Sequence, residues 1–543
     1  MPKRLGMKKR TLKLADIARD GDRVLTGIRV DDLVPLPSPY DRIEEQPVWK
    51  TLTDEQRKAF VCNLDGVVAL NLPAGRSEAE KNKDIQKFIS GMRKLLSREN
   101  NWTFLQPLLL SLDYCARCQT CSDACPVYVA SGRNPLYRPT WRTEVFRRLV
   151  GKYAKPGGRL RAKLGGNDID LNWTTLSRLY ELSYRCTLCR RCAQSCPMAV
   201  DNALLTREMR KVFSQELGWA PPELHAKGTV LHLEAGSPSG MKPRVAKDNV
   251  QFIDEDFSEI TGVEVASPWD EEGADVMLLH SAGEMLAYPA GLAAFAILCR
   301  AAGIKWTLSS EKLGYDGVNY GLFYDDIQFA KIAVRHAQIA KKLKVGKIVM
   351  GECGHQHKAA LAVSDRILIG DLNIRRESVM AFLEHIVFSG KIKFDPSKNN
   401  FPVTLHDPCN IVRNLGIVEP QRRILRYLCP QFREMTPHGI ENYCCGGGGG
   451  LVLMSENNFA DWRAMVAGRL KLKQILEAFS DQPGPEKRKY VCAPCLNCKN
   501  QFRDIFRHYG VREKSNIHHG GLAELIVNAM VDIRQPFLQW EEH

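Results

Sequence analysis

One pattern of four cysteines followed by a proline occurs twice in this chain, about seventy residues apart. Each copy has the spacing C-x2-C-x2-C-x3-C-P, which wraps three thiolates around one [4Fe-4S] cube and directs the fourth thiolate to the neighbouring cube. The sequence therefore predicts two cubane clusters that join both motifs into one module. The first cluster takes Cys115, Cys118, Cys121 and Cys196, and the second takes Cys186, Cys189, Cys192 and Cys125.

Structural zinc is the alternative for such cysteines, because C-x2-C pairs also bind zinc. A zinc site needs four ligands and does not need the x3-C-P ending that closes both copies of the pattern. The spacing therefore favours iron–sulfur binding over zinc.

The composition limits the classes of protein to which the chain can belong. Its 543 residues are enough for three or four domains. The formal net charge of +14 counts cysteines as neutral, and part of this excess is expected to compensate negatively charged clusters. A basic chain can also bind nucleic acid, but no basic stripe with interleaved aromatic residues and no nucleic-acid module is found. We therefore expect no nucleic-acid partner.

The cysteine distribution and the apolar runs indicate the compartment. The 18 cysteines are clustered rather than spaced like a disulfide framework, and the first residues lack the apolar core of a secretory signal. We expect reduced thiols and a cytoplasmic location. The longest apolar run, 291–304, is interrupted by Arg300 and is shorter than the roughly 20 residues that span a bilayer. Any membrane role is thus expected to be peripheral.

Hydrophobic periodicity divides the chain into a helical part and an α/β part. Helical spacing surrounds both cysteine motifs, whereas short β-rich runs (VMLL, KIVMG, VTLH, KYVC) alternate with helical stretches after residue 273. The expected fold is α+β and multidomain. It comprises an N-terminal extension (1–85), a helical di-[4Fe-4S] ferredoxin domain (86–215), a linker (216–272), and two pseudo-repeated α/β lobes (273–395 and 396–535).

The two lobes can be laid over each other, which suggests an internal duplication. Only the second lobe keeps its cysteines, where the first has Gly283, a cysteine-free loop, Cys353 and Gln356. One further metal site is therefore predicted, and its candidate residues are Cys409, Cys444, Cys445, Cys495 and Cys498.

Five cysteines are too many for one cube, which takes four thiolates. Pointing the adjacent Cys444 and Cys445 at one cofactor requires an unusual backbone, and the glycines 446–450 accept positive φ at low cost. Gly446 and Gly447 are accordingly expected to line the cofactor. A phosphate-binding loop is the alternative, but neither G-x-x-x-x-G-K-[ST] nor a strand-borne G-x-G-x-x-G is present.

These five cysteines resemble the CCG domain of heterodisulfide reductases. Together with the two cubane motifs, their order is similar to that of the D-type polypeptide of these enzymes. The segments MGECGH, HDPCN and YCCGG resemble more closely the DsrK-type component of a sulfite-reduction-associated membrane complex. The resemblance covers about residues 100–530. The chain departs from the CCG pattern in the long gap between Cys445 and Cys495 and in the additional Cys492.

The resemblance implies a noncubane [4Fe-4S] cluster held by the five cysteines. It further implies a heterodisulfide reductase-like oxidoreductase that reduces, or forms, a disulfide or trisulfide of a small thiol or carrier protein. Electrons would come from a membrane cytochrome b-type, quinol-oxidising subunit, which would hold this chain at the inner face of the membrane in a hetero-oligomeric complex. Candidates for a role in the sulfur chemistry are His406, Cys353, His355 and His357, because imidazole titrates near physiological pH.

Two other functional interpretations stay open at this point. The chain also resembles non-catalytic iron–sulfur subunits that carry electrons from flavoprotein dehydrogenases to quinone, and a soluble complex with a flavin-containing partner fits the same sequence. The complete five-cysteine set favours the enzyme. The isolated Cys62, Cys299 and Cys429 are interpreted as small core residues.

Overall fold

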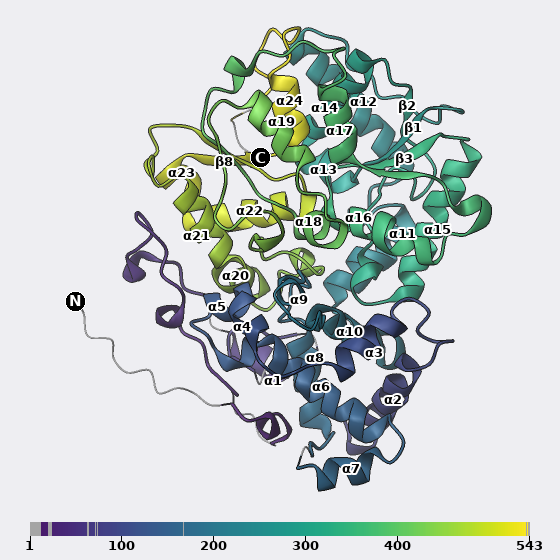
Figure 1. Ribbon diagram of the computed structural model, residues 1–543, viewed down its shortest axis with the longest axis vertical. Helices are drawn as coiled ribbons and strands as arrows, with labels where there is room; N and C mark the ends of the chain where they lie inside the picture. The colour runs from purple at the N-terminus through teal and green to yellow at the C-terminus, as the bar shows by residue number, and fades with distance from the viewer. Residues whose placement is uncertain are drawn as a thin grey trace.

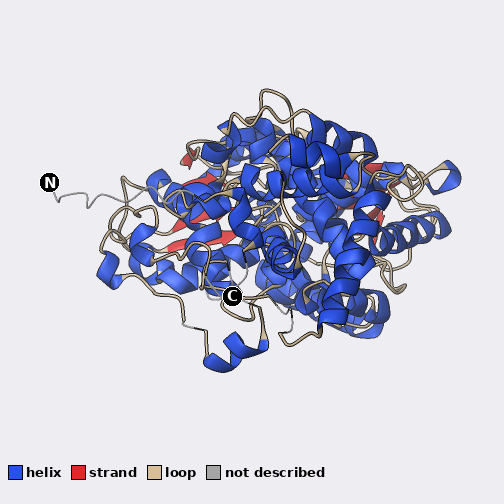
Figure 2. Ribbon diagram, turned by 90° about the horizontal axis from the view of Figure 1, so that it is seen from below, coloured by secondary structure: helices blue, strands red, loops and turns tan. Residues whose placement is uncertain are grey.

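The computed structural model describes residues 12–540, except 20–23, 51, 62, 63, 71, 73, 167 and 539. Cys62 thus lies outside the described residues. A helical module, purple to blue in Figure 1, lies below an α/β part that runs from teal to yellow. Figure 2 shows the strands enclosed by helices. The predicted order of a helical ferredoxin-like module followed by a mixed α/β part is confirmed.

The helical module is built around α10 (Asn202–Leu217). Ser77 caps the first of the surrounding helices by accepting a hydrogen bond from the Glu80 amide. Phe213 of α10 is fully buried against Phe88, with ring centroids 4.9 Å apart. The helices that pack around α10 are α2 (Glu78–Leu95), α3 (Leu105–Asp113), α6 (Pro139–Tyr153) and α8 (Trp173–Ser183).

The segment predicted to be a linker, 216–272, is largely helical. It contains a π-helical turn, η5 (Glu223–Val230), and the 19-residue helix α12 (Pro243–Thr261). Val250, Ile253 and Phe257 recur at helical spacing, and all three are buried in the core that α12 shares with the first lobe. Most of this segment is therefore packed structure rather than a simple connection.

Each lobe contains one four-stranded parallel sheet, and the strand order is the same in both. The first sheet has the order β2-β1-β3-β4, and the second has the order β6-β5-β7-β8. The strands are β1 (Val276–Leu279), β2 (Trp306–Thr307), β3 (Lys347–Met350), β4 (Arg376–Ser378), β5 (Val403–Leu405), β6 (Phe432–Arg433), β7 (Lys489–Cys492) and β8 (Ile517–Gly520).

The helices between the two sheets pack in a reciprocal way. α14 (Pro289–Ala302) of the first lobe contacts α24 (Leu522–Asn528) of the second, and α17 (Val379–Val387) contacts α19 (Pro420–Leu428). The first long helix of each lobe thus meets the last helix of the other. Both sheets and these four helices share one apolar core, so the two lobes are joined by burial of apolar surface.

The lobes also meet at the carboxyl ends of their central strands. The turn after β3 leads into α16 (Gly354–His357), and the turn after β7 leads into α22 (Leu496–Tyr509). The Leu496 amide donates to the Glu352 carbonyl (2.8 Å), and the Gly354 amide donates to Cys495 Sγ (3.2 Å). In open parallel sheets ligands bind at these carboxyl ends. Among the described helices, none has the length and apolar character needed to cross a membrane.

Candidate metal centres

The two cysteine motifs adopt the same backbone conformation. Arg117 and Leu188 occupy equivalent positions before the second cysteine of each motif, and both have positive φ (57° and 52°). Gln119 and Arg190, directly after that cysteine, also match (65° and 62°). Non-glycine residues rarely adopt this conformation, and they do so mostly where a ligand site requires it. The two loops are therefore shaped for the same task.

The first set of four thiols lies close together at the surface of the helical module. The pKa of Cys121 is raised to about 11 by burial and then by the neighbouring thiolates of Cys115, Cys196 and Cys118. Cys118 is exposed. Cys196 belongs to the other motif, so the thiolates that act on Cys121 come from both motifs, and the crossed assignment stays a prediction.

The second set is more deeply placed, between the helical module and the second lobe. Burial, and to a smaller extent the thiolates of Cys189 and Cys186, raises the pKa of Cys125 to about 12. The side chains of Cys186, Cys189 and Cys192 are all buried. Cys125 comes from the first motif, so this grouping also follows the crossed pattern.

The five cysteines of the second lobe converge from three segments. Cys409 begins α18 (Cys409–Leu415), and Cys495 and Cys498 lie at the N-terminus of α22. Cys444 and Cys445 lie in the loop that follows η11 (Gly439–Glu441). Helix N-termini stabilise thiolates through their unpaired N–H groups and dipole. All five side chains are buried.

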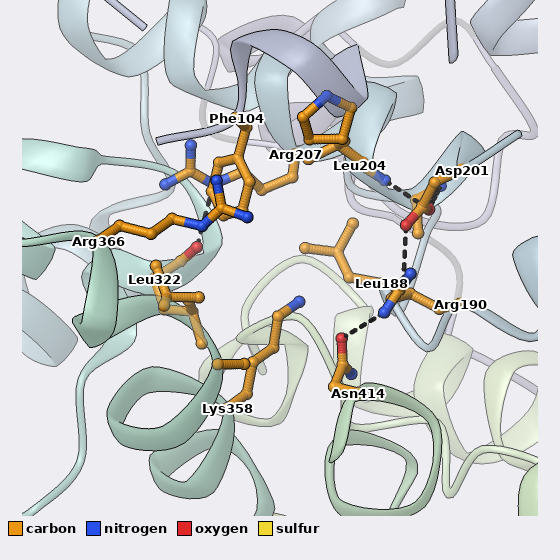
Figure 3. A pocket seen from close by; sticks show the side chains of 14 residues that line it. Phe104, Leu188, Arg190, Asp201, Leu204, Arg207, Leu322, Lys358, Arg366 and Asn414 are labelled. Carbon is orange, nitrogen blue, oxygen red and sulfur yellow. Dashed lines mark hydrogen bonds and ion pairs between the residues drawn. The ribbon is translucent and has the colours of Figure 1, made fainter. Parts of the chain in front are cut away.

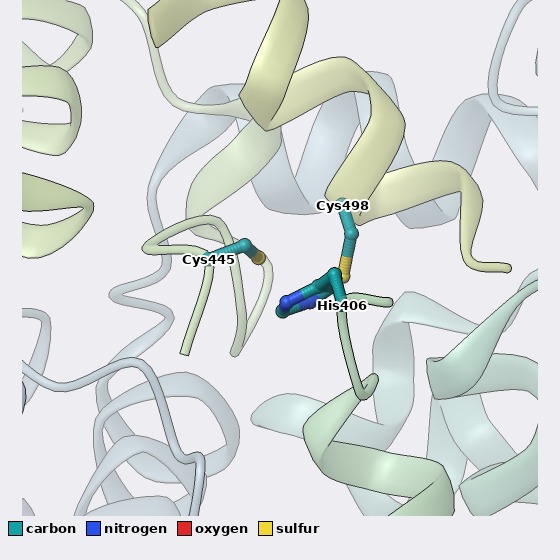
Figure 4. Close-up of side chains that lie close together, drawn as sticks. All are labelled: His406, Cys445 and Cys498. Carbon is teal, nitrogen blue, oxygen red and sulfur yellow. The ribbon is translucent and has the colours of Figure 1, made fainter. Parts of the chain in front are cut away.

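The thiols of this set perturb one another. Cys409 and Cys445 raise the pKa of Cys444, and Cys445 and Cys495 raise the pKa of Cys498. His406 Nε2 lies 3.2 Å from Cys498 Sγ. Ligand atoms of His406, Cys445 and Cys498 lie within 4.8 Å of one another, and Figure 4 shows the three side chains pointing to one place.

The glycine run brings the loop of Cys444 and Cys445 against the second cubane motif. Gly446 has a φ of +100°, a backbone conformation that glycine adopts at low cost. Gly448 leaves no room for a side chain, because an added Cβ would lie 2.6 Å from the Thr187 carbonyl oxygen. Only glycine permits this approach.

Cys444 lowers the pKa of Cys189, and Cys189 raises the pKa of Cys444. Side chains of the second cubane set and of the five-cysteine set are thus close neighbours. Sequence reasoning missed this contact, because the two residues are 255 positions apart and neither motif carries a signal for the other.

Buried cations next to the thiols indicate that the sites carry negative charge when filled. Arg142 donates to Cys186 Sγ (3.2 Å), and Arg413 donates to the Cys189 carbonyl (2.6 Å). Arg210 donates to backbone carbonyls only. In the described part of the chain none of the three arginines has a carboxylate partner, and a buried charge without a counter-charge is costly. Iron–sulfur clusters with thiolate ligands supply that counter-charge, so the residues present fit the cofactor.

Two family models match the chain at these places. The model described as a 4Fe-4S dicluster domain matches residues 111–200, and the model described as a cysteine-rich domain (CCG) matches residues 403–503. The first range contains all eight cysteines of the two motifs, and the second contains the five converging cysteines. Iron–sulfur domains are therefore present in both parts.

The chain is also similar to curated proteins over most of its length. It is 26% identical to the Hdr-like menaquinol oxidoreductase iron-sulfur subunit 2 of Archaeoglobus fulgidus, over 82% of this chain and 83% of the relative. It is 26% identical to the D-type polypeptide of the dihydromethanophenazine:CoB–CoM heterodisulfide reductase of Methanosarcina barkeri, over 73% of this chain and 89% of the relative. These similarities support an HdrD-like iron–sulfur protein.

The similarity to the EtfAB:quinone oxidoreductase of Syntrophomonas wolfei is less complete. The chain is 25% identical to it but covers only 54% of that relative. The names of these relatives all describe oxidoreductases, and the two Hdr-type relatives are matched over more of their length.

Two further candidate residues, His355 and His357, lie near the five thiols and make different contacts. His355 Nδ1 lies 3.1 Å from Cys353 Sγ and 2.9 Å from the Asn497 amide. Both ring nitrogens of His357 are engaged, by the Cys353 carbonyl (2.8 Å) and by Ser378 Oγ (3.0 Å). Burial lowers the pKa of each of these histidines to about 4. Both are therefore neutral near pH 7.

The additional cysteines separate into two groups. Cys353 is hydrogen-bonded to Cys495 and so lies at the edge of the five-thiol set. Cys492 lies instead in the core between the lobes, together with Cys299 and Cys429. Successive side chains of a strand point to opposite faces of its sheet, and β7 directs Cys492 away from the other thiols.

Proposed function

We propose that this chain is the catalytic iron–sulfur subunit of a membrane-associated redox complex that reduces a disulfide or trisulfide. In the proposed path, the two crossed cysteine sets would hold cubane clusters that carry single electrons, and the five cysteines of the second lobe would hold a noncubane centre at which the disulfide is reduced. The proximity of Cys189 and Cys444, which shift each other's pKa, carries the proposal, because it supports electron transfer from the second set to the five-cysteine set.

The burial of the three sets gives the path a direction in space. Cys118 of the first set is exposed, whereas Cys186, Cys189 and Cys192 of the second set and the five cysteines of the second lobe are buried. Close to the motif cysteines along the chain, Leu110 and Tyr114 are each 58% exposed, and Met198 is 49% exposed. Exposed apolar side chains near an exposed cluster ligand in the sequence support docking of the electron donor here.

The chemistry divides between cofactor and protein. When bound, the cubane clusters carry single electrons, and the noncubane centre supplies iron to which a substrate sulfur can bind. The protein provides buried positive charge. Arg413 lies beside the cysteines and stabilises the negative charge that develops on the sulfur atoms. Burial lowers the pKa of Lys471, also beside the cysteines, to about 7, so it is charged in only part of the molecules at neutral pH.

The net reaction is balanced by a quinol. The donor QH2 releases two electrons and two protons as it becomes Q, the S–S bond of RSSR′ is cleaved, and RSH and R′SH form. His406 lies within hydrogen-bond distance of Cys498, and we assign it the task of donating a hydrogen bond to sulfur at this position. Cys353 and His355 lie at the adjoining edge of the site, where they position Cys495.

The relatives support the remaining parts of the proposal. Their names include a menaquinol oxidoreductase and a dihydromethanophenazine-linked reductase. We infer that a membrane cytochrome b-type subunit oxidises the quinol and holds this chain at the inner face of the membrane. The substrate is the disulfide or trisulfide of a small thiol or of a carrier protein. The identical strand order of the two sheets supports their origin by duplication, within lobes 273–395 and 396–535 that follow an extension (1–85), a ferredoxin domain (86–215) and a connecting segment (216–272).

An anaerobic turnover assay tests this function. The purified, iron-loaded protein is given reduced methyl viologen and an organic disulfide, and thiol formation is measured. We expect turnover with the wild-type protein and with Cys429→Ser, since Cys429 lies in the core between the lobes. Cys445→Ser should abolish turnover while the two cubane signals remain. Equal turnover by Cys445→Ser and Cys429→Ser would refute the proposed site of reaction.

A further inference from the structure

The short helix α7 (Gly158–Leu164) lies at the lower end of the helical module in Figure 1. Its sequence is GRLRAKL, and a further glycine pair, 165–166, follows it. Among the large apolar side chains that the structure describes, that of Leu164 is the most exposed (78%), and Leu160 is 65% exposed. Two leucines of one helix are thus presented to the solvent.

The two leucines of α7 share one face, and cations border that face on both sides. Leu160 and Leu164 are four positions apart, which places their side chains one above the other on a helix. Successive residues of a helix are about 100° apart around its axis, so Lys163 and Arg159 lie to one side of the leucines and Arg161 lies to the other. The exposed face of α7 is therefore apolar in the middle and basic at both edges.

The three cations of α7 have no carboxylate partner among the described residues. Arg159 lies over the ring of Tyr153, 5.8 Å from its centroid, and Arg161 donates to the Pro156 carbonyl (3.0 Å). Lys163 forms neither an ion pair nor a hydrogen bond within the described part of the chain. All three side chains are exposed, so their charges are available to a partner outside the chain.

The carboxylates around α7 are already paired with other cations. Lys152 lies 2.5 Å from Asp168 and 3.1 Å from Asp170. Lys155, in the turn that leads into α7, lies 2.6 Å from Asp113. These pairs leave the positive charge of α7 uncompensated by its surroundings.

Close packing against α6 fixes the position of α7. A Cβ at Gly158 would lie 2.0 Å from the Gly151 carbonyl oxygen of α6, so only glycine permits the approach. Gly157, directly before it, turns the chain with a φ of +64°. The ion pair between Lys155 and Asp113 joins this turn to the end of α3. α7 thus lies beside the segment that leads into the first cubane motif.

A second group of cations has a different setting (Figure 3). It lines a pocket of about 240 Å³ between the helical module and the lobes, and it includes Arg190, Arg207 and Lys358. Arg190 is paired with Asp201 (2.7 Å), and Arg207 is paired with Asp326. A concave and partly paired group cannot lie against a flat surface, whereas the exposed and unpaired cations of α7 can.

We propose that α7 binds the headgroup layer of a bilayer that contains anionic phospholipid. Leu160 and Leu164 enter between the lipids, and Arg159, Arg161 and Lys163 contact the phosphates. Amphipathic helices lie in the interface plane with their apolar face buried, and their cations are attracted to anionic lipid. Nucleic acid, another polyanion, is bound by basic side chains interleaved with aromatic ones, and α7 has no aromatic residue. This contact is additional to any contact with a membrane subunit and is independent of disulfide chemistry.

Flotation with protein-free vesicles tests this contact on the iron-loaded full chain. The vesicles consist of phosphatidylcholine alone, or of phosphatidylcholine with about one third phosphatidylglycerol. We expect the protein to float with the anionic vesicles and not with the neutral ones, and high salt should weaken the binding because it screens charge.

Substitutions in α7 test the two parts of the contact separately. Each cation near an anionic surface contributes about fivefold to the partition coefficient, so Arg159→Gln, Arg161→Gln and Lys163→Gln together should lower it about a hundredfold. Leu160→Ser with Leu164→Ser should lower it about tenfold or more, because burial of leucine side chains is lost.

Matched controls make the same changes elsewhere on the surface. Lys83→Gln, Lys87→Gln and Lys331→Gln remove the same number of charges from exposed positions of α2 and of α15 (Asp326–Lys342). Ile369→Ser removes an aliphatic side chain that is 77% exposed, close to the value for Leu164. Both controls should bind anionic vesicles as wild type does, and every variant should keep the iron content and unfolding temperature of wild type, since all these side chains are exposed.

The proposal is overturned if wild-type protein does not float with anionic vesicles, or if the double leucine variant floats equally well. Binding only to membranes that hold a partner subunit, lost in the leucine variant, also overturns it and assigns α7 to a protein contact. Disulfide turnover with reduced methyl viologen needs no bilayer, so the leucine variant should match wild type in that assay. Vesicle binding without any disulfide turnover would refute the proposed function and leave the lipid contact standing.

Discussion

The thiol of Cys444, in the glycine-rich loop of the second lobe, lies close enough to the thiol of Cys189, in the second cubane motif, to lower the pKa of Cys189. This proximity joins two segments that belong to different folding units. The loop comes this close because Gly448 has no side chain to meet the Thr187 carbonyl. In the proposed path, an electron on the second cubane set would therefore be adjacent to the five-cysteine set.

The close approach at Gly448 predicts the effect of one methyl group. Gly448→Ala places a Cβ at 2.6 Å from the Thr187 oxygen, so the loop must move away from the cubane motif. Overpacking of this kind costs about 1–3 kcal/mol. We expect a lower unfolding temperature and slower reoxidation of the pre-reduced clusters by disulfide, measured by stopped-flow absorbance. Gly151→Ala is the control, because its Cβ meets nothing within 4 Å; equal rates in both variants would argue against the contact as the electron route.

The exposed apolar side chains beside Cys118 predict where the electron donor docks. Leu110→Glu combined with Tyr114→Glu adds two negative charges to an apolar face and should weaken reduction by the native membrane partner. Reduction by methyl viologen, which needs no docking surface, should be unchanged. Phe252→Glu provides the control, since Phe252 is 68% exposed on α12, far along the chain from both motifs. A similar loss of reduction by the membrane partner in all variants, or in none, would show that the donor docks at another face.

Cys353 is predicted to position the site without binding iron. Its thiol contacts Cys495, but five other cysteines already form the converging set. Cys353→Ala should therefore keep the full iron content, and it should change the EPR spectrum of the oxidised protein and lower turnover. Cys495→Ser, by contrast, should lose the cluster of the second lobe. Loss of iron from Cys353→Ala would show that Cys353 is itself a ligand.

Much of the fold follows from short local patterns. The buried apolar runs VMLL, KIVM, VTL and KYVC form β1, β3, β5 and β7, because fully covered parallel strands need continuous apolar sequence. The two-residue strands β2 and β6 carry no comparable pattern. The helix α12 did carry such a pattern, the helical spacing of Val250, Ile253 and Phe257. The assignment of this segment to a linker overlooked that spacing.

The candidate site, like the fold, could be predicted from the sequence only in part. Cysteine spacing encodes the local loops, so the groups around Cys121 and Cys125 agree with the crossed pattern. Contacts between distant segments leave no such mark. Arg413 and Lys471 look like surface residues in the sequence, yet both are buried beside the cysteines. Their role arises from packing alone.

Low-temperature EPR of the oxidised, iron-loaded protein, recorded with and without added thiol, tests the central claim most directly. The account predicts a paramagnetic signal that appears on oxidation, changes when thiol is added, and disappears in Cys445→Ser while both reducible cubane signals remain. A fully loaded protein that shows only the two cubane signals, with no response to thiol, would contradict reduction of a disulfide at the five-cysteine site.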